Sequence, residues 1–216
     1  MRKVLLVLIV VMVLVYTFLI PEEPVGTKIL MKLVPMMLII LYAAVNRSIF
    51  SPSYKKIVLV GLVISMTADG VIYWFMAGLA TFFVAHLFYI AAFLSIRRKP
   101  ISLLAATALL LYGLFMVVWI AVPQIESGEF VLGFAIIAYI AVILLMGWVA
   151  MRTRLPLVMI GAILFILSDS FLAIDRFVIP LPGRDALVML TYYAAQVCFA
   201  DSIRSQFSKG KYVFEN

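Results

Sequence analysis

The chain alternates between long apolar segments and short breaks that are charged or rich in proline and glycine, and this alternation limits its fold more than any other feature. A bilayer core of about 30 Å is crossed by roughly 20 apolar residues in a helix. Eight segments approach that length, and they cover residues 4–20, 28–46, 57–75, 77–96, 101–122, 129–151, 156–178 and 186–204. The pattern predicts an all-α, polytopic membrane helix bundle with eight transmembrane helices, which form a single transmembrane domain over residues 1–216.

The breaks between these segments carry the residues that end helices. The weakest break separates the third and fourth segments, where we expect a tight turn near Met76–Gly78. The run PQIESGE at 123–129 is expected to separate the fifth and sixth helices, because it combines a proline, a glycine and two carboxylates.

The composition excludes most soluble classes of protein. Hydrophobic residues make up 67% of the chain and charged residues 12%, against roughly 45–50% and about 25% in soluble domains. A soluble fold of 216 residues leaves too much surface exposed to hide so many apolar side chains. A soluble enzyme, a nucleic-acid-binding domain and a disulfide scaffold are therefore excluded, and the single cysteine, Cys198, is interpreted as a packing residue.

The basic residues predict the orientation of the chain in the membrane. Of the 17 Lys and Arg residues, 13 fall at the two termini or in alternate breaks, on one side of the bundle. Cytoplasmic loops carry such an excess, so both termini are predicted to be cytoplasmic. The net charge of +7 is explained in this way, without a nucleic-acid partner. The chain is therefore predicted to be a multi-pass integral membrane protein, located in the inner or plasma membrane if the host is bacterial.

Several polar side chains lie within the apolar segments, where they are costly and mark functional sites by default. By helix rise, Asp69 and Asp169 lie roughly 3–5 Å outward of the middle of their spans, and Lys32 roughly 7–8 Å outward. His86, Tyr192, Tyr193 and Gln196 fall within about 5 Å of the middle of their spans. The shared depth favours a polar site in the middle and outer half of the bilayer. Hydrogen bonding between helices is the structural alternative, above all for His86.

Two further charged pairs lie near the ends of predicted helices. Asp201 and Arg204 are about one turn apart near the end of the last helix, so an interfacial ion pair is expected. Asp175 and Arg176 lie near the outer end of the seventh helix. Either these two pair with each other, or Arg176 faces a phosphate group.

Asp69 and Asp169 are the candidate catalytic residues. The chain contains no Gly-x-Ser-x-Gly, Walker or HExxH motif, and one histidine with one cysteine gives no metal cluster. Two neighbouring carboxylates in a membrane can hold one proton between them and supply both an acid and a base. That arrangement suits hydrolysis through an oxocarbenium-like state, as in glycosidases, here applied to a lipid.

Four segments together resemble the lysoplasmalogenase family, also called YhhN-like. They are SMTADGVIYW at 65–74, GLATFFVAHLFYIAAF at 78–93, GAILFILSDSFLAIDRF at 161–177 and TYYAAQVCF at 191–199. Lys32 with Pro35 resembles a further family feature, and Ala68 stands where the family is expected to have glycine.

The resemblance implies hydrolysis of the vinyl ether bond of lysoplasmalogens, with no metal or organic cofactor. It implies catalytic roles for Asp69 and Asp169, and a substrate-binding set that consists of Lys32, His86, Arg176, Tyr193 and Gln196. The expected partners are the lysolipid substrate and bilayer lipids, with no nucleic acid and no obligate protein partner.

Two other classes of function remain open at this point. Acidic residues at mid-membrane depth also relay protons, so a proton-coupled transporter of small molecules or lipids is the main alternative. Transporters often have Gly- or Pro-broken spans at matching positions of two repeats, and no such pair is evident in this sequence. A scaffold that uses the polar layer only to join its helices is the third hypothesis.

Overall fold

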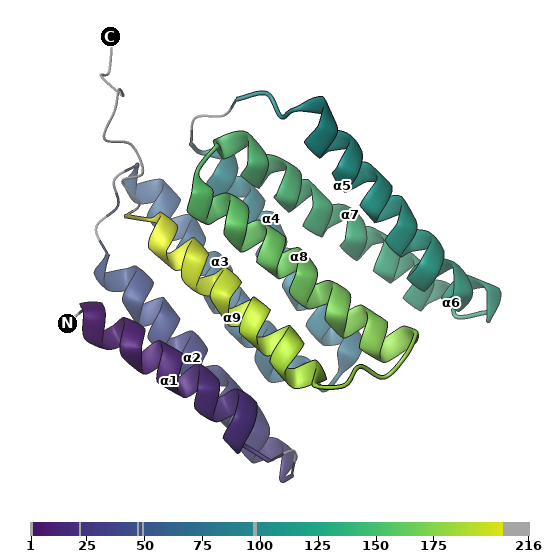
Figure 1. Ribbon diagram of the computed structural model, residues 1–216, viewed down its shortest axis with the longest axis horizontal. Helices are drawn as coiled ribbons and strands as arrows, with labels where there is room; N and C mark the ends of the chain where they lie inside the picture. The colour runs from purple at the N-terminus through teal and green to yellow at the C-terminus, as the bar shows by residue number, and fades with distance from the viewer. Residues whose placement is uncertain (1, 22, 47, 49, 97–98, 205–216) are drawn as a thin grey trace.

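The computed structural model describes residues 2–21, 23–46, 48, 50–96 and 99–204, and all secondary structure in these ranges is helical (Figure 1). The prediction of an all-α fold is confirmed. The elements are α1 (Arg2–Leu19), α2 (Val25–Val45), α3 (Pro52–Val71), α4 (Phe75–Leu94), α5 (Leu103–Met116), a π-helical turn (Val117–Ala121), α6 (Val122–Glu126), α7 (Phe130–Thr153), α8 (Pro156–Phe177) and α9 (Arg184–Ser202). The segments α5, the π turn and α6 are continuous and together form one helical rod, called the α5 rod below. With it, the described chain forms eight helical rods.

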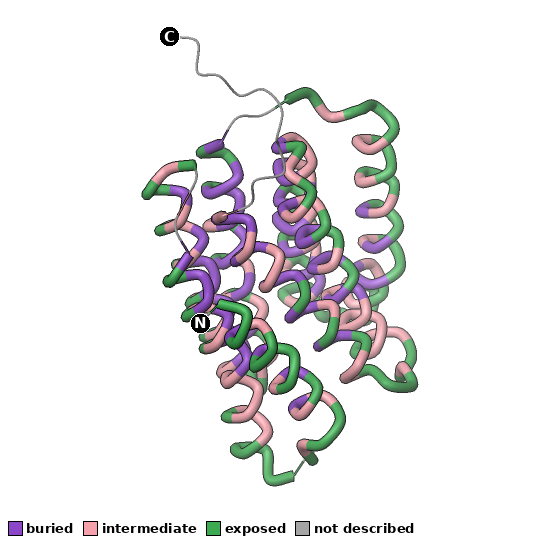
Figure 2. The backbone as a smooth tube through the Cα atoms, turned by 60° about the vertical axis from the view of Figure 1, so that its left-hand side comes forward, coloured by how far each residue is buried: buried purple, intermediate pink, exposed green. Residues whose placement is uncertain are grey.

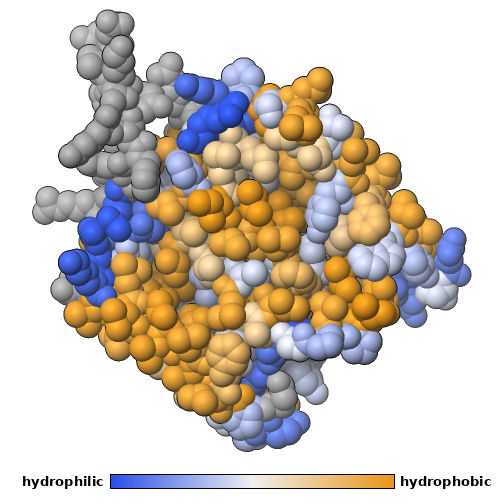
Figure 3. All heavy atoms as spheres, in the orientation of Figure 1, coloured by the Kyte–Doolittle hydropathy of each residue, from blue (hydrophilic) through white to orange (hydrophobic). Residues whose placement is uncertain are grey.

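Six of these rods are long and apolar enough to cross a membrane, and α3 and α9 are not among them. The outer face in Figure 3 is mainly apolar, with hydrophilic patches at the upper left and lower right. A multi-pass membrane protein fits this distribution. The two remaining helices contain many of the polar residues of the chain, which explains why apolarity alone does not select them.

The turn between α3 and α4 lies at residues 72–74 and not near Met76–Gly78, so that predicted boundary was wrong. Gly78 lies within α4, where its lack of a side chain leaves room for Ile72 of the turn. A Cβ at Gly78 would lie 2.8 Å from the Cα of Ile72, nearer than side chains pack. The glycine that was expected to break the helix therefore serves its packing.

The helix beginning at Leu103 continues through Pro123 to Glu126, so the predicted break over 123–129 begins too early. The backbone N–H of Val122 bonds to the carbonyl of Val117, five residues earlier, which is the π-helical register. Pro123 then falls in the first turn of α6, where a missing N–H is tolerated.

Six helices form a closed ring of neighbours, in the order α2, α3, α4, α7, α8, α9 and back to α2. The helices α1 and α5 lie outside this ring, against α2 with α9 and against α7 respectively (Figure 1). Figure 2 shows burial concentrated within the ring, while α1 and α5 expose much of their length. Glycines allow the tightest contacts, as at Gly61, whose Cβ position lies 2.6 Å from the Tyr89 ring.

The end of the ring where α9 finishes is fastened by polar contacts. The Arg204 guanidinium pairs with the Asp201 carboxylate at 2.6 Å, which confirms the predicted ion pair. The Tyr42 hydroxyl also donates to Asp201, and the Tyr54 and Ser202 hydroxyls share a hydrogen bond of 2.6 Å.

Candidate functional site

A cavity of about 420 Å³ opens at the other end of the ring, where α8 leads into α9. Side chains from α1, α2, α3, α4, α8 and α9 line it, together with the 72–74 turn. The predicted site residues Lys32, Asp69, Asp169 and Arg176 are all part of its wall. Helix rise predicted only how deep such residues lie along their helices. The packing of the helices in the ring directs all four side chains toward the same cavity.

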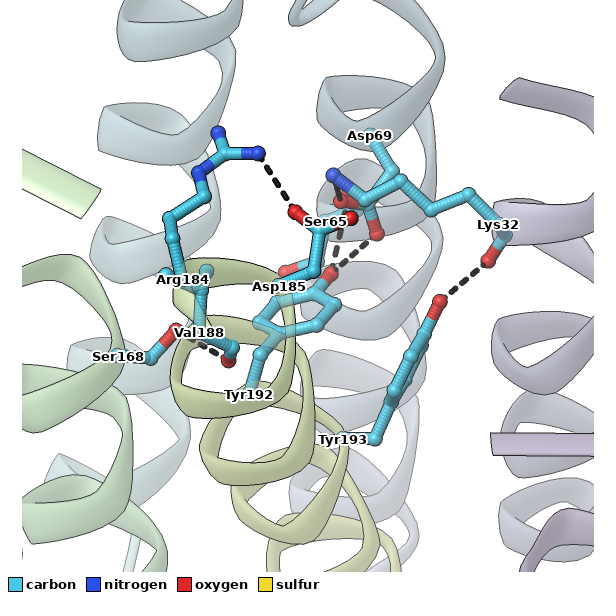
Figure 4. Close-up of polar contacts among 9 residues, drawn as sticks. All are labelled: Lys32, Ser65, Asp69, Ser168, Arg184, Asp185, Val188, Tyr192 and Tyr193. Carbon is cyan, nitrogen blue, oxygen red and sulfur yellow. Dashed lines mark hydrogen bonds and ion pairs between the residues drawn. The ribbon is translucent and has the colours of Figure 1, made fainter. Parts of the chain in front are cut away.

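Asp69 is held on the cavity wall by two strong contacts (Figure 4). The Lys32 ammonium lies 2.9 Å from its Oδ1, and the Tyr192 hydroxyl donates to its Oδ2 at 2.6 Å. Its side chain is only 1% exposed. Because the ion pair to Lys32 and the hydrogen bond from Tyr192 use different oxygens, the carboxylate of Asp69 has little freedom to rotate.

Lys32 is itself fixed from the backbone side. The Tyr193 hydroxyl donates to the Lys32 carbonyl at 2.8 Å and so joins α9 to α2 (Figure 4). Tyr193 is not part of the cavity wall, although the sequence analysis placed it in the substrate-binding set. Its contact orients the helix that carries Lys32.

Asp169 has a different environment on α8. The Tyr139 hydroxyl donates to its Oδ2 at 2.5 Å, and its Oδ1 has no hydrogen-bond partner within the described ranges. Asp169 lines the charged cavity and also a second, apolar pocket between α4, α7, α8 and the α5 rod. It therefore stands where a polar space meets an apolar one.

The second pocket, called the apolar slot below, has a volume of about 70 Å³. Its polar wall residues besides Asp169 are three hydroxyl groups, those of Tyr112, Tyr139 and Ser170. Tyr112 and Ser170 bond to each other, and the Ser170 hydroxyl donates to the Ile166 carbonyl at 2.6 Å. Because these hydroxyls are satisfied, the wall beyond Asp169 is effectively apolar.

Basic side chains surround the mouth of the cavity, and most of them have carboxylate partners. Lys28 pairs with Asp185 at 2.6 Å, and Arg184 pairs with Asp185 at 2.8 Å and with Asp175 at 3.4 Å. Asp175 is therefore paired with Arg184, and no ion pair to its neighbour Arg176 is formed.

Arg176 differs from the other cations at the mouth. Its guanidinium lies over the Phe75 ring, 4.1 Å from the ring centroid. No carboxylate of the described chain forms an ion pair with it. Stacking holds the cation in place while leaving its N–H groups available to an anion.

His86 and Gln196 lie away from both spaces. The His86 Nδ1 is 2.7 Å from the Phe82 carbonyl, and the Phe165 ring packs 4.7 Å from the imidazole. Gln196 accepts a hydrogen bond of 2.7 Å from Tyr89. Neither residue lines the cavity or the slot, so the structure does not bring these two predicted substrate-binding residues to the site.

Tyr139, the hydrogen-bond partner of Asp169, is a site residue that was not predicted from the sequence. It is the lone hydroxyl within the apolar stretch from Phe130 to Val149, and that isolation was the available signal. Within the part of the chain described here, no three His, Cys, Asp or Glu side chains gather in a way that could hold a metal ion.

Six long apolar helices, together with a charged cavity at one end of the ring, indicate an integral, multi-pass membrane protein with a polar site among its helices. Comparison with protein families matches residues 27–203 to the YhhN family, and the chain belongs to that family.

Similar proteins are found in animals and bacteria. The chain is 36% identical over 165 residues to lysoplasmalogenase TMEM86A of Bos taurus, a match that covers 69% of this chain and 65% of the relative. It is 31% identical over 186 residues to lysoplasmalogenase TMEM86B of Rattus norvegicus, covering 82% and 74%. It is 29% identical over 153 residues to a lysoplasmalogenase of Mycobacterium tuberculosis (strain CDC 1551 / Oshkosh), covering 63% and 56%. The match to the cattle protein thus spans less than two thirds of that protein's length. No solved structure gives a significant match.

Proposed function

We propose that this chain is a membrane-embedded hydrolase that cleaves the vinyl ether bond of lysoplasmalogen-type lysolipids. The products are a fatty aldehyde and a glycerophospho-alcohol. The observation that carries the proposal is the position of Asp169 at the junction of the charged cavity and the apolar slot. In such a lysolipid the vinyl ether joins the polar half to the hydrocarbon chain, so it reaches Asp169 when each half occupies the matching space. The names of the relatives support the same activity.

The reaction needs one acid and one water molecule. A proton adds to the vinyl carbon that is not bonded to oxygen, and the other vinyl carbon becomes part of an oxocarbenium ion. Water adds to that carbon and loses a proton. The resulting hemiacetal then releases the glycerol hydroxyl and leaves the aldehyde. Every atom comes from substrate or water, so two carboxyl groups suffice as acid and base.

We assign the acid to Asp169 and the stabilising anion to Asp69. Asp169 keeps one oxygen without a partner and lies beside the slot. Asp69 is bound to an ammonium and a hydroxyl, which suits a fixed negative charge facing a developing cation. Asp69 can also accept the proton of the attacking water.

Arg176 and Lys32 are the proposed contacts for the head-group phosphate. Arg176 is held by Phe75 at the cavity wall, and its fork of N–H groups matches a phosphate. In this proposal Tyr193 acts through Lys32, and His86 and Gln196 act only through packing and hydrogen bonds. No metal or organic cofactor enters the reaction. The partners are the substrate and bilayer lipids, without a nucleic acid or an obligate protein.

The proposed membrane arrangement keeps the prediction from the charge distribution. All eight rods cross the bilayer as a single domain, both termini are cytoplasmic, and the cavity opens in the outer half. The even number of rods supports this, as does the separation of Arg2, Lys3 and Arg204, at the start of α1 and just after α9, from the cavity mouth.

A proton-coupled transporter is less well supported. Beneath the site, the interior is filled by fully buried aromatic rings, with Phe199 lying 4.7 Å from Tyr89 and 5.3 Å from Phe93. Hydrogen bonds lead inward from Asp69 through Tyr192, Ser65 and Tyr89 and end at Gln196. Within the described residues they do not reach the polar contacts around Asp201, so a continuous polar route for transport is not supported.

The test is aldehyde release by purified protein in detergent, without any ion gradient, from vinyl ether lysolipids. An ester lysolipid and a saturated ether lysolipid of equal length are the controls, because neither contains the enol ether that acid can protonate. Release from the vinyl ether alone is expected. The absence of release, under conditions where the protein stays folded, would reject the hydrolase.

A further inference from the structure

We infer that the apolar slot binds the part of the hydrocarbon chain next to the ether bond, and that Leu144 sets how much of the chain it holds. This inference rests on the proposed function and adds a specificity-determining residue to it. Asp169, the group assigned to protonate the vinyl carbon, lies in the wall of the slot, which extends from there inward to Leu144 and outward to Ile136 and Phe177. A chain attached to that carbon therefore enters the slot directly.

The chemistry of the wall fits a hydrocarbon and excludes the head group. Beyond Asp169 and the hydroxyls already described, its residues are aliphatic or aromatic, among them Met116, Ile140 and Leu144. The basic residues belong to the other cavity, and none lines the slot. Burial of each methylene in such a space is favoured by the hydrophobic effect, whereas a phosphate would lose its solvation there without a partner.

Helix geometry gives the length of this contact. Tyr139, which bonds to Asp169, and Leu144 both lie on α7 and both line the slot. Five residues of helix separate their depths by roughly 7–8 Å. On α7, Leu144 is the wall residue farthest from the cavity mouth. The inward part of the slot, from Asp169 to Leu144, therefore contacts only the first few methylenes beyond the reacting carbon.

Leu144 is supported from behind by the outlying helix α5. A Cβ at Gly113 would lie 2.2 Å from the Leu144 Cδ1, so the missing side chain of Gly113 leaves room for the leucine. A helix outside the ring thus helps to position the residue that limits the slot.

The test measures kcat/KM for vinyl ether lysolipids of increasing chain length, with native protein and with Leu144→Phe and Leu144→Ala. For native protein, kcat/KM should rise with each methylene and then level off once the slot is full. Leu144→Phe should level off at a shorter chain, and its ratio of long-chain to short-chain kcat/KM should fall about tenfold, as expected for about two lost methylene contacts. Leu144→Ala should level off at a longer chain.

Leu145→Phe is the matched control, because Leu145 lies on the same helix but is 50% exposed on the outside and lines neither space. It should keep the native profile. An equal loss at every chain length in both Leu144 variants would overturn the inference. If Leu144→Phe does not fold, an unchanged profile in Leu144→Ala would overturn it as well.

A separate measurement distinguishes this inference from the proposed function. Saturated ether lysolipids cannot be cleaved by this route, and their affinity is measured by competition against a fluorescent lysolipid. If native protein releases no aldehyde, the proposed function fails, and the affinities still report on the slot. The slot inference fails if the dependence of affinity on chain length is the same in native protein and both Leu144 variants.

Discussion

Asp69 and Asp169 line one cavity from different helices, but the protein holds them in different ways. Asp69 has an ammonium on one oxygen and a phenol on the other, and its side chain is almost fully buried. Asp169 has a single phenol, is partly exposed to the cavity and also borders the apolar slot. Two residues that look equivalent in the sequence therefore differ in the freedom to exchange a proton.

The difference assigns a separate physical role to each carboxylate. A charge inside an apolar bundle is tolerated when it is paired and hydrogen-bonded, and Lys32 with Tyr192 meets this need for Asp69. No cation of the described structure forms an ion pair with Asp169. These differences support the proposed role of Asp169 in proton transfer, while the contacts of Asp69 also join α2, α3 and α9.

The largest expected effect comes from Asp169→Asn. The amide keeps the shape of the side chain but cannot donate a proton with the strength of a carboxylic acid. We expect kcat to fall by about 10³-fold, within the usual range for a general acid, with a melting temperature close to that of native protein. Asp175→Asn is the control, since Asp175 pairs with Arg184 and lies outside both spaces. Loss of less than half the activity in folded Asp169→Asn would reject the assignment of the acid.

Asp69→Asn should reduce both activity and stability, which separates it from Asp169→Asn. Asp69→Asn breaks the ion pair to Lys32, whereas Asp169 has no such ion pair in the described structure. Removing one partner leaves the ammonium unpaired, at a cost of about 2 kcal/mol in the free energy of unfolding. We expect kcat to fall about 10²-fold.

The double variant Asp69→Asn with Lys32→Met isolates the two effects. It should recover the melting temperature in detergent, because no unpaired charge remains, while kcat stays low. Recovery of activity together with stability would show that Asp69 acts only through structure.

The sequence predicted the helices better than it predicted which side chains meet. Hydropathy and breakers gave the eight rods, and helix rise placed Lys32, Asp69 and Asp169 in one layer. Depth is one coordinate, however, and rotation about the helix axis is decided by packing between helices. His86 shares that layer but points into the aromatic interior, so depth alone did not separate it from the cavity residues.

Local breakers were misread for a related reason. Gly78 and Pro123 both suggest ends of helices in the sequence. In the structure Gly78 permits close packing against Ile72, and Pro123 follows a π-helical turn that absorbs its missing N–H. Neither effect can be recognised without the neighbouring residues in space. The predicted positions of the turn between α3 and α4 and of the end of α6 were therefore wrong by a few residues.

A smaller effect is expected from the phenols that hold the two carboxylates. Tyr139→Phe removes the one hydrogen bond to Asp169. We expect kcat to fall about tenfold, the equivalent of one hydrogen bond to a charged group, and the alkaline limb of the pH profile, where the acid loses its proton, to move. Tyr192→Phe leaves Asp69 with its ion pair, so kcat should change less. The pH profiles of the two variants measure this difference directly, and identical profiles would contradict distinct roles for the two aspartates.

The smallest effect is expected at the mouth of the cavity, from Arg176→Gln. Arg176 is the stacked cation without a carboxylate partner in the described structure, so a head-group phosphate meets no competing anion there. Its loss should raise KM about fivefold and leave kcat nearly unchanged, as expected when binding is lost equally in ground and transition states. Arg184→Gln is the matched control, because Asp175 and Asp185 already neutralise that guanidinium. A fall in kcat at constant KM for Arg176→Gln would instead place the guanidinium at the reacting bond, and equal effects of the two arginines would remove the distinction between a free and a paired cation.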